Sequence, residues 1–152
     1  VDNISIVLGK NLESIKSIIS DQNIKFLKNN DYQNGISTSI KKGIENLNPA
    51  SCGVLICLGD MPLIKTDTYN EIIDAFYKSN NRSVIPYFKK KRGNPILFSQ
   101  QHFKELLSIS GDNGAKFFIN KKKNEFLSIS VSDEGVLLDI DNKTQFKSFI
   151  KK

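Results

Sequence analysis

Two kinds of apolar segment alternate along this chain, and that alternation restricts its fold more than any other feature. Short runs rich in isoleucine, valine and leucine, such as 3–9 and 53–59, have the length and composition of β-strands. Other segments carry apolar residues at helical spacing, as Ile36, Ile40 and Ile44 do. Strands that alternate with helices predict an α/β fold with a mainly parallel sheet and flanking helices.

The same patterns predict the remaining elements and the domain organisation. Helices are expected at 11–20, 36–47, 65–79, 100–108, 112–122 and 143–152. Further strands are expected at 23–29, 82–88, 94–99, 126–131 and 135–141. The chain has no internal repeat and no proline-rich linker, and its 152 residues suffice for one hydrophobic core. Residues 1–152 are therefore expected to form a single domain.

Composition limits the classes of protein to which the chain can belong. The sequence is 39% hydrophobic and 25% charged, which is ordinary for a globular protein, and no apolar run approaches the roughly 18 residues of a membrane span. The net charge of +6 favours anionic ligands, but no aromatic platform interleaves with the basic residues, so nucleic acid is not an expected partner. No secretion leader is evident, and Cys52 and Cys57 are expected to be buried and reduced, which indicates a cytoplasmic protein.

The apolar strand in "VLICLGDMPLI" (54–64) ends at an acidic residue, Asp60, which is followed closely by Pro62. Ligands of open α/β sheets gather at the carboxyl ends of strands, and a carboxylate there is a suitable ligand for Mg²⁺. The alternative interpretation is that Asp60 caps the turn by accepting hydrogen bonds from the backbone amides of residues 62 and 63. Spacing alone leaves both interpretations open.

A second pair of acids, Asp139 and Asp141, closes the predicted strand 135–141. Residues two apart in a strand share a face, so both carboxylates would lie on the same side. Two neighbouring acids repel each other unless solvent or a cation meets them. The pair indicates either a contribution to a metal site or a strand that ends in solvent.

Four motifs, "CLGDMPLI", "RGNPILF", "GDNGAK" and "GVLLDIDNKTQF", resemble in order and approximate spacing those of the MobA/MocA-like nucleotidyltransferases. The similarity covers nearly the whole chain and is closest to the molybdenum cofactor cytidylyltransferase branch. It implies an α/β sandwich that is Rossmann-like in its first half and belongs to the GT-A-like type. It also implies transfer of CMP from CTP to the phosphate of molybdopterin bearing molybdenum, with release of pyrophosphate and with Mg²⁺ as cofactor.

The resemblance assigns roles to individual residues. Asp60 and Asp141 match the catalytic carboxylates that hold Mg²⁺, with Asp139 as the reserve for Asp141. Gly35 and Ser39, in the loop "NNDYQNGISTSIKKGI", match positions that contact the nucleotide base. Nucleotide contacts are also expected of Gly59 and Asp60, and contacts with the acceptor substrate are expected of Arg92, Gly93, Asn94, Pro95 and Asp112.

Residue chemistry adds detail to several of these roles. Arg92 can grip a phosphate with two parallel hydrogen bonds, so it is expected to face the acceptor or the triphosphate, whereas residues 89–91 are expected to form a solvated loop. Asp112 is expected either to cap the helix 112–122 or to form a wall of the acceptor site. His102 has no other metal-type ligand beside it in the sequence and is expected to be structural.

The chain departs from the family pattern at its start. The first strand and glycine-rich loop of the family, roughly LAAGxSxRMGxxK, cradle the triphosphate and have no counterpart in the 152 residues. The first strand here corresponds to the second strand of the family, and the sequence begins at Val1 rather than methionine. An N-terminally truncated chain without turnover of its own is therefore expected. Ile36 stands where the cytidylyltransferases usually have methionine, which bears on the choice of branch.

Other functions stay open beside the cytidylyltransferase hypothesis. One is a related nucleotidyltransferase that uses GTP or loads a different phosphorylated acceptor. Another is a non-catalytic chaperone domain that binds the molybdenum cofactor and hands it to a molybdenum enzyme. An intact glycine-rich loop in the full gene would favour catalysis, and its loss would favour the chaperone.

Overall fold

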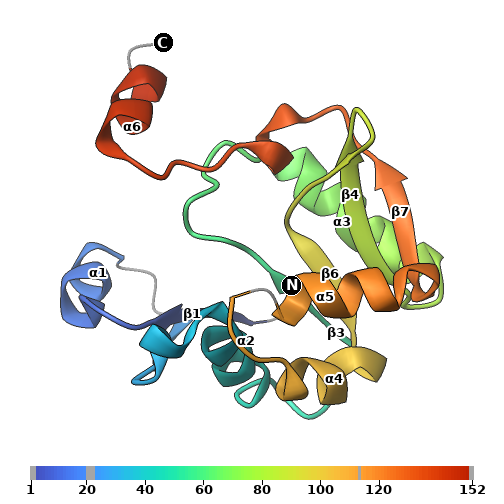
Figure 1. Cartoon of the computed structure of the whole chain (residues 1–152), viewed down its shortest axis with the longest axis horizontal. Helices are drawn as coiled ribbons and strands as arrows, with labels where there is room; N and C mark the ends of the chain where they lie inside the picture. Colours follow the sequence, from blue (N-terminus) through green and yellow to red (C-terminus); the bar gives the residue numbers. More distant parts are fainter. Residues whose placement is uncertain (1–2, 20–22, 113, 151–152) are drawn as a thin grey trace. The chain divides into compact units, whose positions relative to one another are not determined.

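The computed structural model describes residues 3–19, 23–112 and 114–150, and the chain divides into two compact units. Unit 1 consists of Val1–Ser51 and Gln101–Lys123, and unit 2 consists of Cys52–Gln100 and Asn124–Lys152. Each unit is built from two separate stretches of sequence, which can be followed by colour in Figure 1. The expectation of a single domain over residues 1–152 stays a prediction.

Unit 1 opens with a parallel strand pair joined by a helix. β1 (Ile4–Leu8) leads through α1 (Leu12–Ile18) into β2 (Ile24–Lys28), and Ile6 lies opposite Phe26 in the ladder. A helical crossover is the usual way to connect neighbouring parallel strands. These elements confirm the predicted strand–helix–strand order, and the expectation that the first half of the chain is Rossmann-like stays a prediction.

Helices α2 (Ile36–Ile44), α4 (Phe103–Ser108) and α5 (Gly114–Lys121) belong to the same unit. α2 packs against β1 and against α4, and α4 packs against α5. All three were predicted from the sequence, α2 from its apolar residues at helical spacing. Positions 20, 113 and 151–152 of the predicted helices, together with Val1, lie outside the described residues.

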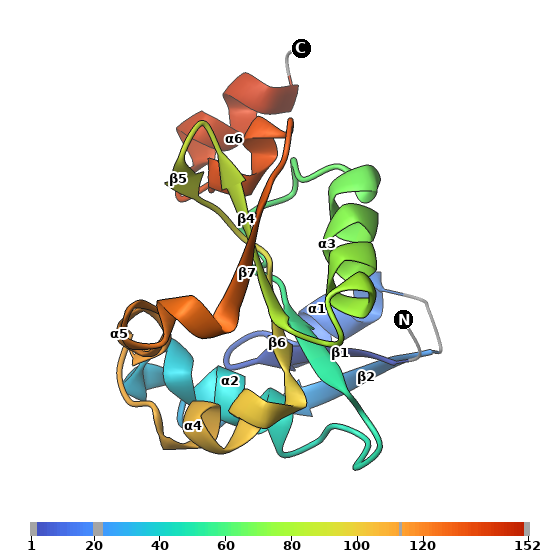
Figure 2. The ribbon, with the colours of Figure 1, turned by 90° about the vertical axis from the view of Figure 1, so that its right-hand side faces the viewer.

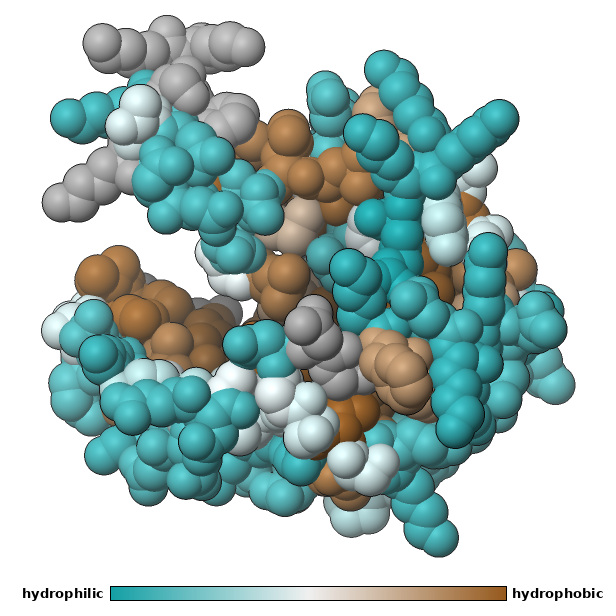
Figure 3. Space-filling view, viewed as in Figure 1, coloured by the Kyte–Doolittle hydropathy of each residue, from teal (hydrophilic) through white to brown (hydrophobic). Residues whose placement is uncertain are grey.

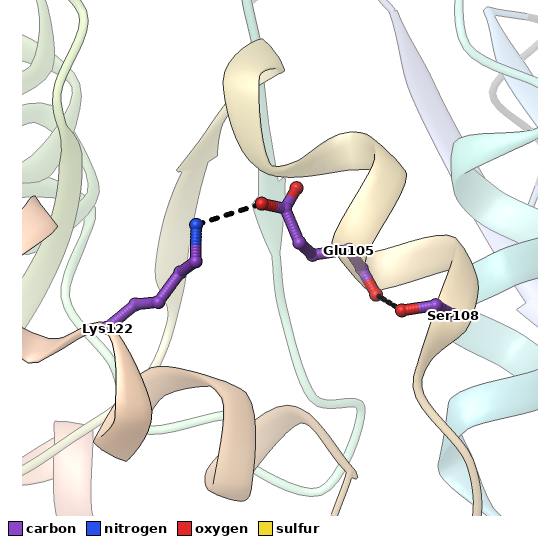
Figure 4. Close-up of polar contacts among 3 residues, drawn as sticks. All are labelled: Glu105, Ser108 and Lys122. Atoms are coloured by element: carbon purple, nitrogen blue, oxygen red, sulfur yellow. Dashed lines mark hydrogen bonds and ion pairs between the residues drawn. The ribbon is translucent and has the colours of Figure 1, made fainter.

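An aromatic contact and an ion pair fasten α4 to α5. The ring of His102 is fully buried and meets the ring of Phe118 edge-on, with 5.3 Å between the ring centres, as fits its expected structural role. Lys122 Nζ donates to Glu105 Oε1 at 2.9 Å, and the Ser108 hydroxyl donates to the Glu105 carbonyl oxygen at 2.7 Å (Figure 4). The hydrogen bond from Lys122 lowers the pKa of Glu105 below its ordinary value.

Unit 2 is built around a mixed sheet. Its strand order is β3 (Gly53–Ile56), β6 (Ile96–Ser99), β4 (Ser83–Phe88) and β5 (Lys91–Arg92), and β7 (Phe126–Ser130) also pairs with β4. The pairings β3–β6, β4–β6 and β4–β5 are antiparallel, and the pairing β4–β7 is parallel.

The expectation of a mainly parallel sheet is therefore wrong for unit 2. After β4 the chain turns back through Lys89 and Lys90 directly into β5 and β6, without a helix between them. A direct return of this kind makes the neighbouring strands antiparallel. Between β3 and β4 the chain does cross over through a helix, but the sheet places β6 between these two strands.

That crossover helix, α3 (Thr66–Lys78), lies along one face of the sheet (Figure 2). Its residues Ile72 and Phe76, one turn apart, are buried together with Val84 of β4 and Leu97 of β6. Burying a side chain of this size contributes about 1.5–3 kcal/mol. The amphipathic pattern that predicted α3 thus marks the core of unit 2.

The predicted strand at 135–141 is wrong. Residues Glu134–Leu137 form a 3₁₀ turn, η4, and residues 138–141 have no strand pairing in the described chain. A Cβ on Gly135 would lie 2.5 Å from the carbonyl oxygen of Leu63, and Val136 is fully buried. The apolar residues here pack a turn, and a short apolar run does not distinguish such a turn from a buried strand. α6 (Lys143–Ile150) follows, as predicted.

Both cysteines, Cys52 and Cys57, are free and exposed, so the expectation that they are buried is wrong. In the described part of the chain, no helix combines the length and apolar character that crossing a membrane requires.

Candidate active site

Asp60 lies in an exposed turn, four residues after β3 ends at Ile56. Within this turn the N–H of Met61 is directed at the carbonyl oxygen of Leu58, 3.4 Å away. Pro62 has no N–H group, and no described residue donates a hydrogen bond to the Asp60 carboxylate, so the interpretation of Asp60 as a cap for residues 62 and 63 is wrong. A Cβ on Gly59 would meet no atom within 4 Å, so the backbone beside Asp60 is open to a ligand.

A backbone hydrogen bond joins this turn to the second acidic segment. The N–H of Ile140 donates to the carbonyl oxygen of Asp60 at 2.8 Å. Asp139 and Asp141, on either side of Ile140, have exposed side chains. Among the described residues no hydrogen bond or ion pair engages the carboxylates of Asp60, Asp139 or Asp141. The two predicted metal ligands, Asp60 and Asp141, thus lie on adjoining backbone segments with uncommitted oxygen atoms.

The backbone of Asp141 is held by the start of α6. Gln145 Oε1 accepts hydrogen bonds from the N–H groups of Asp141 and Asn142, at 2.8 and 3.2 Å. In return, Asn142 Oδ1 accepts from the N–H groups of Thr144 and Gln145, at 3.1 and 2.9 Å. This reciprocal arrangement is a capping box, and it explains the sequence "DNKTQ" in physical terms.

A buried carboxylate that the sequence motifs did not identify, Asp133, joins two further stretches of the chain, one that follows the Asp60 turn and one that precedes Asp139. Its side chain is 4% exposed. Oδ2 accepts from the N–H of Lys65 at 2.8 Å and from the hydroxyl of Thr68 at 2.7 Å, and Oδ1 accepts from the N–H of Gly135 at 2.9 Å. Asp133 therefore links the start of α3 to the turn η4.

Burial by itself raises the pKa of Asp133, but its hydrogen bonds act in the opposite direction. The N–H of Lys65, the hydroxyl of Thr68 and the N–H of Gly135 together outweigh the effect of burial and lower the pKa below its ordinary value. The group is therefore a structural carboxylate that is stable in its charged form.

The motif "RGNP" packs against η4. The N–H of Gly93 donates to the carbonyl oxygen of Pro86 at 2.8 Å, and the N–H of Asn94 donates to that of Val136 at 2.9 Å. A Cβ on Gly93 would lie 2.6 Å from Val136 Cγ2, so only glycine fits here. The peptide bond before Pro95 is cis. Gly93 and Pro95 are buried and Asn94 is half-buried, and the substrate contacts expected of this motif stay predictions.

The basic segment before this motif is a tight hairpin turn rather than a loop. Lys89 and Lys90 connect β4 to β5 with φ angles of 46° and 67°, the left-handed pattern of a two-residue type I′ turn. Arg92 lies in β5 opposite Tyr87 and is half-buried. Hydrophilic side chains project around the tip of this hairpin (Figure 3). The lysines are exposed, as predicted, and the direction of the Arg92 side chain toward a phosphate stays a prediction.

In unit 1 the predicted base loop and the "GDNG" motif meet. Gly35 has a φ of 96°, and a Cβ there would lie 2.7 Å from Asp112 Oδ1. That oxygen accepts the N–H of Ile36 at 2.9 Å, and the N–H of Ser37 is directed at the carbonyl oxygen of Gly111 at 3.3 Å. Asp112 therefore caps α2, whereas the sequence predicted a cap for the helix 112–122. The alternative of a wall of the acceptor site stays a prediction.

The other predicted base contact, Ser39, is held by a residue that sequence reasoning missed. Asn29, directly after β2, is 4% exposed, and its side-chain nitrogen donates to the hydroxyls of Thr38 and Ser39 at 2.9 and 3.0 Å. Nothing in the sequence separates this asparagine from an ordinary polar residue at the end of a strand. Its burial is the only sign of its role.

The site residues thus fall into two groups, one in each unit. Unit 2 brings together Asp60, Asp141 and the "RGNP" motif, which are suited to a cation and to phosphate groups. Unit 1 brings together Gly35, Ser39 and Asp112 in a polar loop at the start of α2. The described residues contain no group of three or more histidine, cysteine or acidic side chains that could hold a metal. A cation at Asp60 and Asp141 would therefore take its other ligands from water or substrate.

Comparison with known proteins gives a family and a fold. The sequence profile described as the MobA-like NTP transferase domain matches residues 1–126. The chain is 24% identical over 127 residues to the molybdenum cofactor cytidylyltransferase of Escherichia coli (strain K12). The match covers 84% of this chain but only 62% of that protein, so the chain spans less than two thirds of the length of this relative.

Solved structures of similar fold cover almost the whole chain. Rv0371c from Mycobacterium tuberculosis H37Rv has a TM-score of 0.85 at 20% identity, covering 99% of this chain and 76% of that one. Its complex with manganese has a TM-score of 0.82 at 20% identity, covering 99% and 79%. The 4-diphosphocytidyl-2C-methyl-D-erythritol synthase from Anaerococcus prevotii DSM 20548 has a TM-score of 0.77 at 17% identity, covering 100% and 80%. These likenesses confirm the α/β nucleotidyltransferase fold.

Proposed function

We propose that this chain, which belongs to the MobA-like NTP transferase domain family, is the part of a nucleotidyltransferase that binds and orients the substrates. The reaction would transfer CMP from CTP to the phosphate of molybdopterin or the molybdenum cofactor and release pyrophosphate. The observation that carries the proposal is the backbone hydrogen bond from the N–H of Ile140 to the carbonyl oxygen of Asp60, because it joins the two segments that carry Asp60 and Asp141. The name of the Escherichia coli relative supports CTP and the molybdenum cofactor as the substrates.

Asp60 and Asp141 would hold one Mg²⁺, with Asp139 as the reserve for Asp141. The donor set fits this ion, because Mg²⁺ is bound through one or two carboxylates and keeps its other positions for water and phosphate oxygens. The manganese complex of the Mycobacterium tuberculosis protein is consistent with a divalent ion in this fold. When bound, the ion would neutralise negative charge on the α-phosphate and on the departing pyrophosphate.

The residues of the chain itself would bind and orient the reactants. Phosphoryl-type transfer needs in-line positioning more than covalent help from the protein. The open backbone at Gly59 would lie against the triphosphate. Arg92 would bind a phosphate of the acceptor or of the triphosphate with two parallel hydrogen bonds, and Asn94 would contact the acceptor.

The base would be bound by Gly35 and Ser39. Gly35 allows the backbone to approach the base closely, and the Ser39 hydroxyl can form a hydrogen bond with its edge. Asp112 would support this loop by capping α2 and would border the acceptor. The product would pass to a molybdenum enzyme in the cytoplasm.

Titration of CTP and GTP into the chain in the presence of Mg²⁺ tests the choice of nucleotide. CTP should bind more tightly than GTP. Ser39→Ala should reduce the difference between their binding free energies by about 1–2 kcal/mol, the scale of one buried hydrogen bond. Ser17→Ala, which removes an exposed hydroxyl from α1, is the matched control and should change neither affinity. Tighter binding of GTP would overturn the cytidylyl assignment and leave the family membership intact.

Pyrophosphate release with molybdopterin as acceptor tests the reaction. Because the 152 residues carry no glycine-rich phosphate loop, we expect binding without turnover from this chain, and turnover when a family glycine-rich segment is added before residue 1. Turnover with another phosphorylated acceptor but not with molybdopterin would overturn the acceptor assignment. A chain that binds molybdopterin but neither nucleotide would be the chaperone instead.

A further inference from the structure

Asn29 is a buried polar side chain that the motifs of the family do not explain. It extends the ladder of β2 by donating its backbone N–H to the carbonyl oxygen of Leu8 at 2.8 Å. Its side-chain oxygen accepts the N–H of Asp31 at 3.0 Å, and its side-chain nitrogen donates to the hydroxyls of Thr38 and Ser39. The amide oxygen and both amide hydrogens therefore have partners.

The direction of these hydrogen bonds is determined by the donors around the amide. The backbone N–H of Asp31 can only donate, so the oxygen of Asn29 must face it. The nitrogen of Asn29 must then face the two hydroxyls, and a nitrogen of this kind only donates. Both hydroxyls, of Thr38 and of Ser39, are consequently acceptors toward Asn29.

The two hydroxyls differ in where their own hydrogens can go. The Thr38 hydroxyl lies 2.9 Å from the carbonyl oxygen of Gly35 and 3.1 Å from that of Asp31, so its hydrogen is used within the loop. The Ser39 hydroxyl donates to no group in the described part of the chain. Ser39 is half-buried, which leaves its hydrogen available to a ligand.

We propose that Asn29 is a specificity-determining residue, because it makes Ser39 a hydrogen-bond donor toward the nucleotide base and so favours cytosine over guanine. The inference rests on the proposed function. Cytosine presents two adjacent acceptors, O2 and N3, whereas the two groups of guanine that pair with them, N1–H and the N2 amino group, are donors and leave O6 as the one acceptor on that edge. A hydroxyl whose hydrogen points at this part of the base leaves the N1–H or the N2 amino group of guanine unpaired, and buried unpaired groups discriminate strongly between ligands.

Asn29→Asp tests the direction of the hydrogen bond with little change in shape. A carboxylate can only accept, so the hydroxyls of Thr38 and Ser39 would turn their hydrogens toward it, while the N–H of Asp31 keeps its acceptor. Ser39 would then face the base with lone pairs. The ratio of CTP affinity to GTP affinity should fall by about tenfold or more, as expected for one mismatched hydrogen bond.

Two further variants show whether Asn29 acts through Ser39. The double variant of Asn29→Asp with Ser39→Ala should have the same affinity ratio as Ser39→Ala alone, because the hydroxyl that Asn29 directs is then absent. Asn46→Asp is the matched control, since Asn46 is a half-buried asparagine just after α2 that donates to the Lys42 carbonyl oxygen at 3.0 Å. It should leave the ratio unchanged.

Calorimetric titration of CTP and GTP with Mg²⁺, with circular dichroism to check folding, separates the outcomes. Wild-type chain that does not prefer CTP overturns the proposed function. If the wild-type chain prefers CTP, two results overturn this inference alone. One is a ratio of CTP affinity to GTP affinity that is unchanged in Asn29→Asp. The other is a ratio that is lower in the double variant than in Ser39→Ala. If Asn29→Asp does not fold, Asn29→Ala removes the directing donor and should lower the ratio about threefold or more, and an unchanged ratio there overturns the inference.

Discussion

Replacing Asp133 with asparagine should lower the stability of unit 2 by more than the removal of an exposed surface charge would. The carboxylate is buried and accepts three hydrogen bonds, two of them from the backbone N–H groups of Lys65 and Gly135. These bonds fasten the start of α3 to η4. The substitution keeps the shape of the side chain, so it tests the hydrogen bonds rather than the packing.

The expected magnitude follows from the donors. Asparagine has one acceptor oxygen and one NH₂ group, and whichever way the amide is turned, the NH₂ faces the backbone N–H of Lys65 or of Gly135. An unsatisfied buried donor costs about 1–3 kcal/mol, and a hydrogen bond to a charged group contributes about 1.5–3 kcal/mol. Allowing for partial relaxation, we expect Asp133→Asn to lower the free energy of unfolding by about 2–4 kcal/mol.

The pH dependence provides a second test of the same carboxylate. Because its hydrogen bonds hold the pKa of Asp133 below the ordinary value of 3.8, the folded state binds its proton less readily than the unfolded state. The stabilisation is complete above the unfolded pKa and is lost as the pH falls through the folded pKa. Stability should therefore drop in wild type as the pH falls below about 4, and this drop should be smaller in Asp133→Asn.

Urea unfolding followed by far-ultraviolet circular dichroism measures both effects, since the chain has no tryptophan. Asp74→Asn, in α3, is the control, because its ion pair with Lys78 is exposed at 3.5 Å and should contribute less than about 0.5 kcal/mol. A loss in Asp133→Asn no larger than that of the control would refute the reasoning. A loss of stability below about pH 4 that is as large in Asp133→Asn as in wild type would also refute the reasoning.

Two further predictions concern the hairpin and the motif that follows it. Replacing Lys89 with asparagine and Lys90 with glycine should raise the free energy of unfolding by about 1 kcal/mol in thermal melts, because these residues suit the φ angles of 46° and 67°. Gly93→Ala should lower it by about 2 kcal/mol or more, because the added Cβ would lie 2.8 Å from the Val136 carbonyl oxygen. A stable alanine variant would show that η4 can move away.

Helices and strands with a clear local period could be predicted from the sequence, because one buried face imposes that period. α3 shows this, since Ile72 and Phe76 are apolar for the same reason that they are buried. The arrangement of strands could not be predicted in this way. The return from β4 to β6 depends on two lysines in a turn conformation that usually takes asparagine and glycine, so the turn signal was absent.

Motif resemblance predicted that Asp60 and Asp141 share a metal ion, which stays a prediction, and the backbone contact between their segments has a different physical basis from the one expected. The acidic segment is not a strand whose end lies beside the end of β3. A backbone hydrogen bond from Ile140 joins it to the Asp60 turn, Gln145 holds its end, and the buried carboxylate of Asp133 fixes the turn η4 before it. Such contacts join residues that are far apart in the sequence, so they produce no periodic pattern of residues from which they could be predicted.

Asn29 and Asp133 were missed for a related reason. Asparagine and aspartate are common in turns and at the ends of strands, and Asn29 ends a predicted strand while Asp133 lies between two predicted strands. What distinguishes them is burial with several hydrogen bonds, a property of the folded chain. Asp112 shows the same limit, since a cap was expected from its position but the helix that it caps is α2, far away in the sequence.

Paramagnetic broadening by Mn²⁺ in two-dimensional ¹H–¹⁵N spectra tests most directly the claim that Asp60 and Asp141 hold one divalent ion. Substoichiometric Mn²⁺ should broaden the backbone amides of residues 59–61 and 139–142 first. Asp60→Asn should remove the broadening from both segments, including the one that it does not alter, because one ion is shared between them. Broadening that persists at 139–142 in Asp60→Asn, or that centres elsewhere in the wild-type chain, would contradict the shared metal site.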